Sequence, residues 1–174
     1  MYDPDKIMYT LDEYLAGLRY VESGSVDGDY EAVNASSGAF GAYQITPKYM
    51  DYIVSEAGEN PANIADPAVQ DRVAEYWARL HYSDFGNWDL VGVAWHAGAS
   101  NARLVLAQEV PCLSGPAVTI EQIGAAIPGE SSYVEKVRTG CQVWRERMLA
   151  PDYSGLEQIV LPVAGNFYLQ PVVS

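Results

Sequence analysis

The sequence is poor in positive charge. Its 174 residues include only 10 lysines and arginines against 23 aspartates and glutamates, so the formal net charge is −13 at pH 7. Because nucleic acid binding requires cationic side chains that neutralise phosphates, this balance disfavours a nucleic acid partner. It also disfavours simple electrostatic attachment to an anionic cell wall or lipid surface. The composition therefore favours a neutral ligand, or one delivered by another part of an assembly.

Cysteine is scarce and long apolar runs are missing. Cys112 and Cys141 are too few for a disulfide scaffold and have no metal-binding spacing. A single bridge stays open, but Cys141 falls on the apolar face of a predicted helix, which favours a buried thiol. No apolar run approaches the roughly 20 residues of a membrane span, and the N-terminus shows no signal-peptide pattern. We expect either export by another route or a fragment of a larger protein.

Apolar residues, by contrast, are plentiful and recur with helical spacing. They make up 49% of the chain, as in folded globular domains. One helix is predicted around Leu11, Leu15, Leu18 and Glu22, which follow i, i+4, i+7 and i+11 spacing. Capping and proline signals predict further helices. The segment 88–98 is apolar on all sides, so we expect it to be the central buried helix. Their expected starts are Pro47 after Thr46, Pro67 after Asp66, Trp88 after Asn87, Ala99 after Gly98, Thr119, and a capping box of Ser132 with Glu135. Two of these helices have clear apolar faces, one made of Val69, Val73, Trp77 and Leu80 and the other of Val134, Val137, Cys141, Trp144 and Met148.

The character of the sequence changes after Pro151. Residues 156–174 are rich in β-branched side chains and are interrupted by proline and glycine. This composition is typical of extended chain or a short strand rather than helix. We therefore predict a helical domain over residues 1–150 and an extended segment, or a linker to a following domain, over residues 151–174.

Glu22 is the first candidate for chemistry. It lies on the same stripe as three leucines, where partial desolvation favours the neutral carboxyl group and raises its pKa. An acid whose pKa is raised in this way can serve as a general acid near neutral pH. The polar, glycine-rich loop that follows would let a polymer approach closely. By position alone, a solvated or capping glutamate is the alternative.

Four motifs then occur in order: "VESG", "SSGAFGAYQI", "VGVAWHAG" and "IPGESSYVEKV". Together they resemble the soluble lytic transglycosylase family and its goose-type-lysozyme-like relatives, over roughly Leu11 to Met148. The resemblance implies a mainly α, lysozyme-like helical domain with a central buried helix. It also implies that Glu22 is the sole catalytic acid.

The resemblance assigns further residues by position. The implied substrate-binding residues are Ser23 beside the acid, the Gly-x-x-Gln motif Gly41, Ala42, Tyr43 and Gln44, then Trp95 and His96 where the family has Tyr and Asn, and Tyr133 near the catalytic glutamate. Aromatic rings with polar edges suit pyranose sugars, which makes Tyr30, Tyr43, Trp95 and Tyr133 candidates to line a groove.

The chain departs from the family pattern in three places. His96 replaces an amide, and a neutral imidazole nitrogen can donate or accept one hydrogen bond but cannot do both. The late motif is two residues shorter than the family's, which leaves Glu130 without an assigned role. A longer loop after Glu22 brings Asp27 and Asp29 near the expected cleft.

The activity implied by the resemblance is cleavage of the β-1,4 bond between N-acetylmuramic acid and N-acetylglucosamine in peptidoglycan. Glu22 would act as acid and then as base, forming a 1,6-anhydro product. One alternative is an inverting lysozyme in which Asp27 or Asp29 holds a water. Another, of a different class, is a non-catalytic structural or wall-docking module of a phage virion.

The expected partners are peptidoglycan glycan strands, with no cofactor. His81 and His96 do not form a known ligand spacing with nearby acids, so no metal site is predicted. The acidic charge and the strand-like C-terminus favour one domain of a larger, virion-associated protein, such as a phage tail or tape-measure protein acting on the cell wall. A secreted bacterial enzyme is the alternative.

Overall fold

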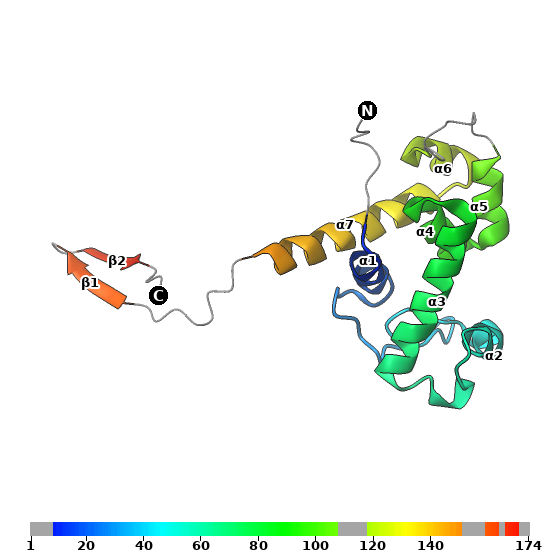
Figure 1. Ribbon diagram of the computed structural model, residues 1–174, viewed down its shortest axis with the longest axis horizontal. Coiled ribbons are helices and arrows are strands. Elements are labelled where there is room, and N and C mark those ends of the chain that lie inside the picture. The colour runs from blue at the N-terminus through cyan, green and yellow to red at the C-terminus, as the bar shows by residue number, and fades with distance from the viewer. Residues whose placement is uncertain (1–8, 108–117, 151–158, 164–165, 171–174) are drawn as a thin grey trace.

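The computed structural model describes residues 9–107, 118–150, 159–163 and 166–170 (Figure 1). Helices dominate this part of the chain, as predicted, and none of its helices is long and apolar enough to cross a bilayer. The elements in chain order are α1 (Leu11–Ser23), α2 (Pro47–Glu56), the short 3₁₀ helix η1 (Pro61–Asn63), α3 (Pro67–Phe85), α4 (Trp88–Ala97), α5 (Ala99–Leu106), α6 (Ile120–Ala126), α7 (Glu130–Leu149), β1 (Ile159–Val163) and β2 (Asn166–Gln170).

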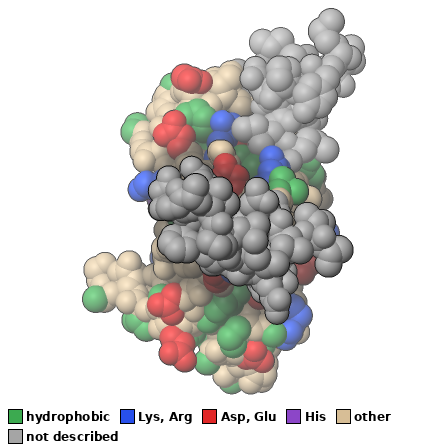
Figure 2. All heavy atoms as spheres, turned by 90° about the vertical axis from the view of Figure 1, so that its left-hand side faces the viewer, with side chains coloured by type: hydrophobic (Ala, Val, Ile, Leu, Met, Phe, Trp, Pro, Cys, Tyr) green, Lys and Arg blue, Asp and Glu red, His purple; other side chains and the backbone are tan. Residues whose placement is uncertain are grey.

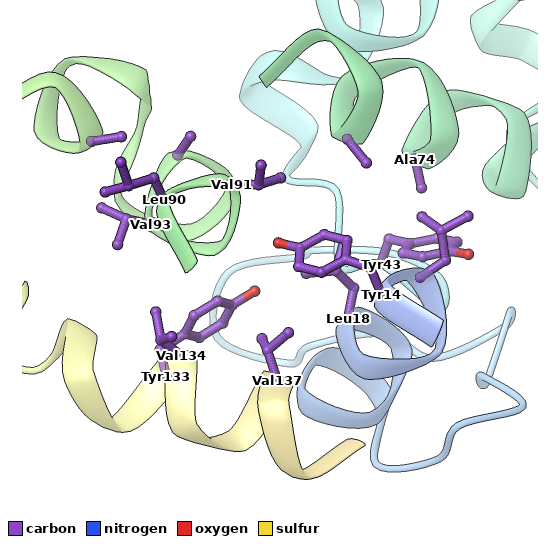
Figure 3. Packing of buried hydrophobic residues seen from close by; sticks show 14 of the residues in the cluster. Tyr14, Leu18, Tyr43, Ala74, Leu90, Val91, Val93, Tyr133, Val134 and Val137 are labelled. Atoms are coloured by element: carbon purple, nitrogen blue, oxygen red, sulfur yellow. The ribbon is translucent and has the colours of Figure 1, made fainter. Parts of the chain in front are cut away.

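Helix α4 is the central buried helix that the sequence predicted. Asn87 caps it, because its side-chain oxygen accepts the backbone N–H groups of Asp89 and Leu90. Its residues from Asp89 to Ala94 are buried, and α3, α5 and α7 pack around it. Figure 3 shows side chains of α4 facing Val134 of α7 across the core. His96 lies near the C-terminal end of this helix, just past its buried residues.

Helices α1 and α7 approach each other closely at two glycines. A Cβ atom on Gly17 would lie 2.6 Å from Cys141 Sγ, and one on Gly140 would lie 2.9 Å from the Cα of Gly17. Only glycine allows this approach, because any larger residue would push the two backbones apart. The contact fixes the C-terminal end of α1 beside the first turns of α7.

The two cysteines divide between described and undescribed residues. Cys141 is a fully buried free thiol in the α1–α7 contact, which confirms the prediction of a buried thiol there. Cys112 lies outside the described residues.

Both ends of α1 are well defined. Thr10 caps its start in a reciprocal capping box with Glu13, and Glu13 also pairs with Arg145 of α7 at 2.6 Å. The helix ends at Gly24, whose φ of 82° is the left-handed conformation that glycine adopts most readily. This ending exposes the last turn of α1, where Glu22 lies.

The structure corrects three details of the predicted helices. Helix α7 begins at Glu130 after Gly129, whose φ is 96°, so the predicted capping box of Ser132 and Glu135 is wrong and Ser132 lies inside the helix. Leu80 and Met148 continue apolar stripes but are 38% and 64% exposed. In Figure 1 the C-terminal half of α7 extends beyond the other helices. The apolar periodicity of α7 therefore continues into a part of the helix that none of the other described helices covers.

Strands β1 and β2 pair in antiparallel fashion, with Val163 opposite Asn166. Residues 159–163 and 166–170 thus have the strand character predicted after Pro151, whereas the domain boundary and the role of this segment as a linker stay predictions. On the face shown in Figure 2, acidic side chains are spread over both ends of the helical body rather than gathered in one patch.

Candidate active site

Glu22 lies in the last turn of α1 and is partly exposed. Its Oε1 atom accepts a hydrogen bond of 2.6 Å from the hydroxyl of Tyr133, which is 111 residues away on α7. The close approach of α1 and α7 makes this contact between distant residues possible. The tyrosine assigned by resemblance is therefore beside the acid.

Burial raises the pKa of Glu22 above the ordinary value for glutamate, because removal from water penalises the charged form. Two neighbours oppose this effect and lower the pKa. The first is the hydrogen bond from Tyr133, and the second is the charge of His96. Burial is the largest of the three causes, so Glu22 retains its proton to a higher pH than an exposed glutamate does.

A second pair of ionisable residues, His96 and Glu130, lies next to Tyr133. The ring of His96 stacks on that of Tyr133, with centroids 4.3 Å apart and an interplanar angle of 14°. Its Nδ1 atom is 2.8 Å from Oε1 of Glu130. Glu130 is 6% exposed, whereas the His96 side chain is 51% exposed. We call these four residues the Glu22 cluster: Glu22, Tyr133, His96 and Glu130.

Glu130 is the member of the Glu22 cluster that sequence reasoning missed. The shortened late motif concealed its position, since no residue match could be assigned there. A signal was present nonetheless, because Glu130 precedes Tyr133 by three residues and this spacing puts both on one helical face.

Ser23 organises the loop after α1, and its role in substrate binding stays a prediction. Its hydroxyl donates to the backbone oxygen of Arg19 and accepts the backbone N–H of Asp29, both at 3.0 Å. This pair of bonds ties the start of the inserted loop to α1.

The two candidate second acids are both exposed. Asp27 forms an ion pair with Arg147 at 2.7 Å, and a carboxylate oxygen of Asp29 accepts the backbone N–H of Glu31. Within the described residues, neither carboxylate has a hydrogen bond to a member of the Glu22 cluster. Their role as a second acid stays a prediction.

The Gly-x-x-Gln motif forms a tight turn around a buried amide. Gly41 has a φ of 79°, and a Cβ on it would lie 2.1 Å from Oε1 of Gln70. That oxygen accepts the N–H of Ala42, while Nε2 donates to the backbone oxygens of Tyr30 and Ile64. Gln70, 1% exposed, thus holds the loop from inside, and sequence reasoning did not single it out.

Gln44 completes the turn with a positive φ of 50°. Its amide nitrogen donates to the backbone oxygen of Gly41 at 2.9 Å, and its side chain is only partly buried. A non-glycine residue in this conformation is uncommon and is held by its surroundings.

Tyr43 is a core residue, which corrects its expected place in a groove. It is 1% exposed, and its hydroxyl receives a hydrogen bond from Arg19 and donates one to Asp71, both at 2.7 Å. Tyr30 donates to the same Asp71 oxygen at 2.8 Å. We call these four residues the Asp71 network: Arg19, Tyr30, Tyr43 and Asp71. Ala42 is likewise fully buried.

Trp95 keeps part of its surface exposed. It packs edge-on against Tyr43, with ring centroids 6.2 Å apart. Of the four predicted groove-lining aromatics, Trp95 and Tyr30 are partly exposed, while Tyr43 and Tyr133 are buried. In the described part of the chain, no group of three His, Cys, Asp or Glu side chains could hold a metal ion.

No protein-family model and no curated protein matches the sequence. Solved structures do. The chain is similar to the 70 kDa soluble lytic transglycosylase Slt70 from Escherichia coli, with a TM-score of 0.60 and 21% identity over 79% of this chain and 22% of that one. It is also similar to an inactive mutant of the lytic transglycosylase Slt from Pseudomonas aeruginosa, with a TM-score of 0.60 and 20% identity over 80% of this chain and 22% of that one.

These similarities show the fold. The described helices have the arrangement of the lytic transglycosylase helical fold, which confirms the predicted fold class. This chain spans only 22% of the length of either enzyme.

Proposed function

We propose that this chain cleaves the glycan strands of peptidoglycan as a lytic transglycosylase, with Glu22 as its acid and base. One observation carries the proposal: in a fold shared with two lytic transglycosylases, a partly exposed glutamate has its pKa raised by burial and receives a hydrogen bond from Tyr133. Perturbed acids of this kind concentrate at functional sites.

The reaction needs two proton transfers, one from Glu22 and one back to it. Protonated Glu22 gives its proton to the glycosidic oxygen as the bond from that oxygen to C1 of the muramoyl sugar breaks. The acetamido group of the same sugar stabilises the positive charge at C1. Ionised Glu22 then removes the proton from the C6 hydroxyl, whose oxygen bonds to C1 and closes the 1,6-anhydro ring.

Two features of the site suit these steps. The raised pKa keeps the proton on Glu22 until it is needed. The hydroxyl of Tyr133 donates to Oε1 and stabilises the carboxylate in the ionised interval between the two transfers. A single carboxyl group thus performs both steps, in contrast to the pair used by most glycosidases.

Analysis of the fragments tests this function directly. Purified glycan strands are incubated with the wild-type protein, and mass spectrometry of the products is expected to show 1,6-anhydro-muramoyl ends. Reducing ends that carry an oxygen from labelled water would instead establish hydrolysis, and Asp27→Asn and Asp29→Asn would then identify the second acid.

The variant Glu22→Gln tests the assigned acid. Loss of a general acid and base is expected to lower the cleavage rate by about 10²- to 10⁴-fold. Glu31→Gln is the matched control, because Glu31 is an exposed carboxylate in the loop after α1. Undiminished cleavage by Glu22→Gln would exclude the proposed mechanism. If the wild-type protein binds glycan without cleaving it, the wall-docking alternative holds.

The setting of this activity is a further proposal. We place it in a virion-associated protein, such as a phage tail or tape-measure protein, with a secreted bacterial enzyme as the alternative. The strong negative charge of the chain, −13, supports action through the site itself rather than through adhesion to an anionic wall.

A further inference from the structure

Glu130 is a buried carboxylate with a single partner. It is 6% exposed, its Oε1 atom contacts His96 Nδ1 at 2.8 Å, and its Oε2 atom is buried without a hydrogen bond to any described residue. An unpaired buried charge is costly, so this position needs a compensating interaction. Glu130 is also the first residue of the 20-residue helix α7, where the partial positive charge of the helix N-terminus stabilises an anion.

The contact determines which nitrogen of His96 carries hydrogen. An ionised carboxylate can only accept, so Nδ1 must be the donor. In the neutral imidazole the other nitrogen, Nε2, is then unprotonated and acts as an acceptor. Stacking on Tyr133 fixes the plane of the ring, and the side chain is 51% exposed.

We propose that Glu130 is a positioning residue that holds His96 as its Nδ1–H tautomer, so that Nε2 is presented to the bound glycan as an acceptor for a sugar N–H or O–H group. This inference rests on the proposed function and deepens it. A side-chain amide at the same position could offer a donor and an acceptor together, whereas the neutral ring of His96 held by Glu130 offers only an acceptor at Nε2.

The same pair acts on the acid. The ionisable groups around His96 are Glu130 and Tyr133 of α7 and Glu22 of α1, with Tyr14 of α1 next to Tyr133. The charge of His96 lowers the pKa of Glu22, so the ring that Glu130 contacts also acts on the acid.

The tautomer can be measured without reference to activity. The chain contains only two histidines, His81 and His96, so nitrogen NMR of the imidazole rings in labelled protein resolves both. At pH 8 we expect His96 of the wild-type protein to be the Nδ1–H form. In Glu130→Gln, an amide that can donate as well as accept allows the Nε2–H form to become populated. Nε2–H in the wild-type protein would overturn the inference and needs no variant.

Activity provides the second readout. The value of kcat/KM for Glu130→Gln is expected to fall by roughly 10-fold, the lower end of what loss of an orienting partner costs at metal sites. Glu135→Gln is the matched control, because Glu135 lies on the same helix but is exposed, and it should change neither kcat/KM nor the tautomer.

The outcomes separate this inference from the proposed function. If Glu130→Gln leaves the His96 tautomer unchanged, whatever its effect on activity, Glu130 does not orient the ring and the inference is wrong. If no glycan is cleaved by the wild-type protein while the tautomer responds as expected, the proposed function fails but Glu130 still orients His96. Thermal melting of each variant checks that it is folded.

Discussion

In the described part of the chain, two carboxylates, Asp71 and Glu22, accept hydrogen bonds from tyrosine hydroxyls, and they differ in whether an arginine lies beside them. Asp71 accepts hydrogen bonds from Tyr30 and Tyr43 and lies 3.5 Å from Arg19. Glu22 accepts one hydroxyl, from Tyr133, and burial outweighs that bond so that its pKa is raised. A tyrosine hydroxyl thus donates to a carboxylate paired with arginine at Asp71, and to an acid with a raised pKa at Glu22.

This difference separates a structural network from the proposed reactive site. The Asp71 network ties α1, α3 and the loop of residues 24–45 together, and its arginine balances its anion. In the Glu22 cluster, the interactions with Tyr133 and His96 do not fully offset the burial of the Glu22 carboxylate. This is unfavourable for stability but suits proton transfer. Three variants test the contrast.

The largest effect is expected for Tyr133→Phe. Loss of a hydrogen bond to a charged group should lower kcat by about 10- to 100-fold, because ionised Glu22 loses its donor during the reaction. Since that bond lowers the pKa of Glu22, the alkaline limb of kcat/KM should move to higher pH. The measurement is the pH–rate profile. In Tyr43→Phe the limb should stay in place, and a shift as large as in Tyr133→Phe would contradict the contrast.

A smaller effect is expected for Asp71→Asn, and on stability. The change leaves the largely buried Arg19 without its anion and should lower the free energy of unfolding by about 1–2 kcal/mol. Urea denaturation measures it. Asp84→Asn provides the control, because Asp84 pairs with Arg103 at the surface, where such a pair contributes about 1 kcal/mol or less. Equal losses in both variants would show that the Asp71 network has no special structural role.

The smallest effect is expected for the stability of Glu22→Gln. Because the folded-state pKa of Glu22 is raised, the stability that its proton contributes is fully present below the unfolded pKa and is lost as pH rises through the folded pKa. The variant lacks this dependence, so its stability relative to wild type should increase over that pH range, by on the order of 1 kcal/mol or less. Denaturation at several pH values checks the sign, and a relative decrease would show that Glu22 is stabilised as an anion.

The sequence predicted the helices where local signals and packing agree. Asn87 caps α4 and Asp66 caps α3, as their side chains indicated, because capping depends on nearby backbone groups. The apolar stripe of α7 predicted the buried Val134 and Cys141 but also the exposed Met148. Periodicity shows which face of a helix is apolar, and it does not show where the neighbouring helix ends.

The candidate site was predicted less completely, because its decisive contacts join residues far apart in sequence. Glu22 and Tyr133 were found from their motifs, and the structure brings them together. The burial of Tyr43 and the pairing of Glu130 with His96 depend on tertiary packing, and no local pattern contains that information. Gln70 was overlooked because a single glutamine in a helix is usually solvated.

The close contact between Gly17 and Gly140 bears on when the site can exist. The two helices of that contact come from segments more than a hundred residues apart, and α7 carries both the hydroxyl next to Glu22 and the carboxylate that pairs with His96. A truncated form that ends before α7 would retain the carboxyl group of Glu22 without these two partners, so under the proposed function it is expected not to cleave glycan.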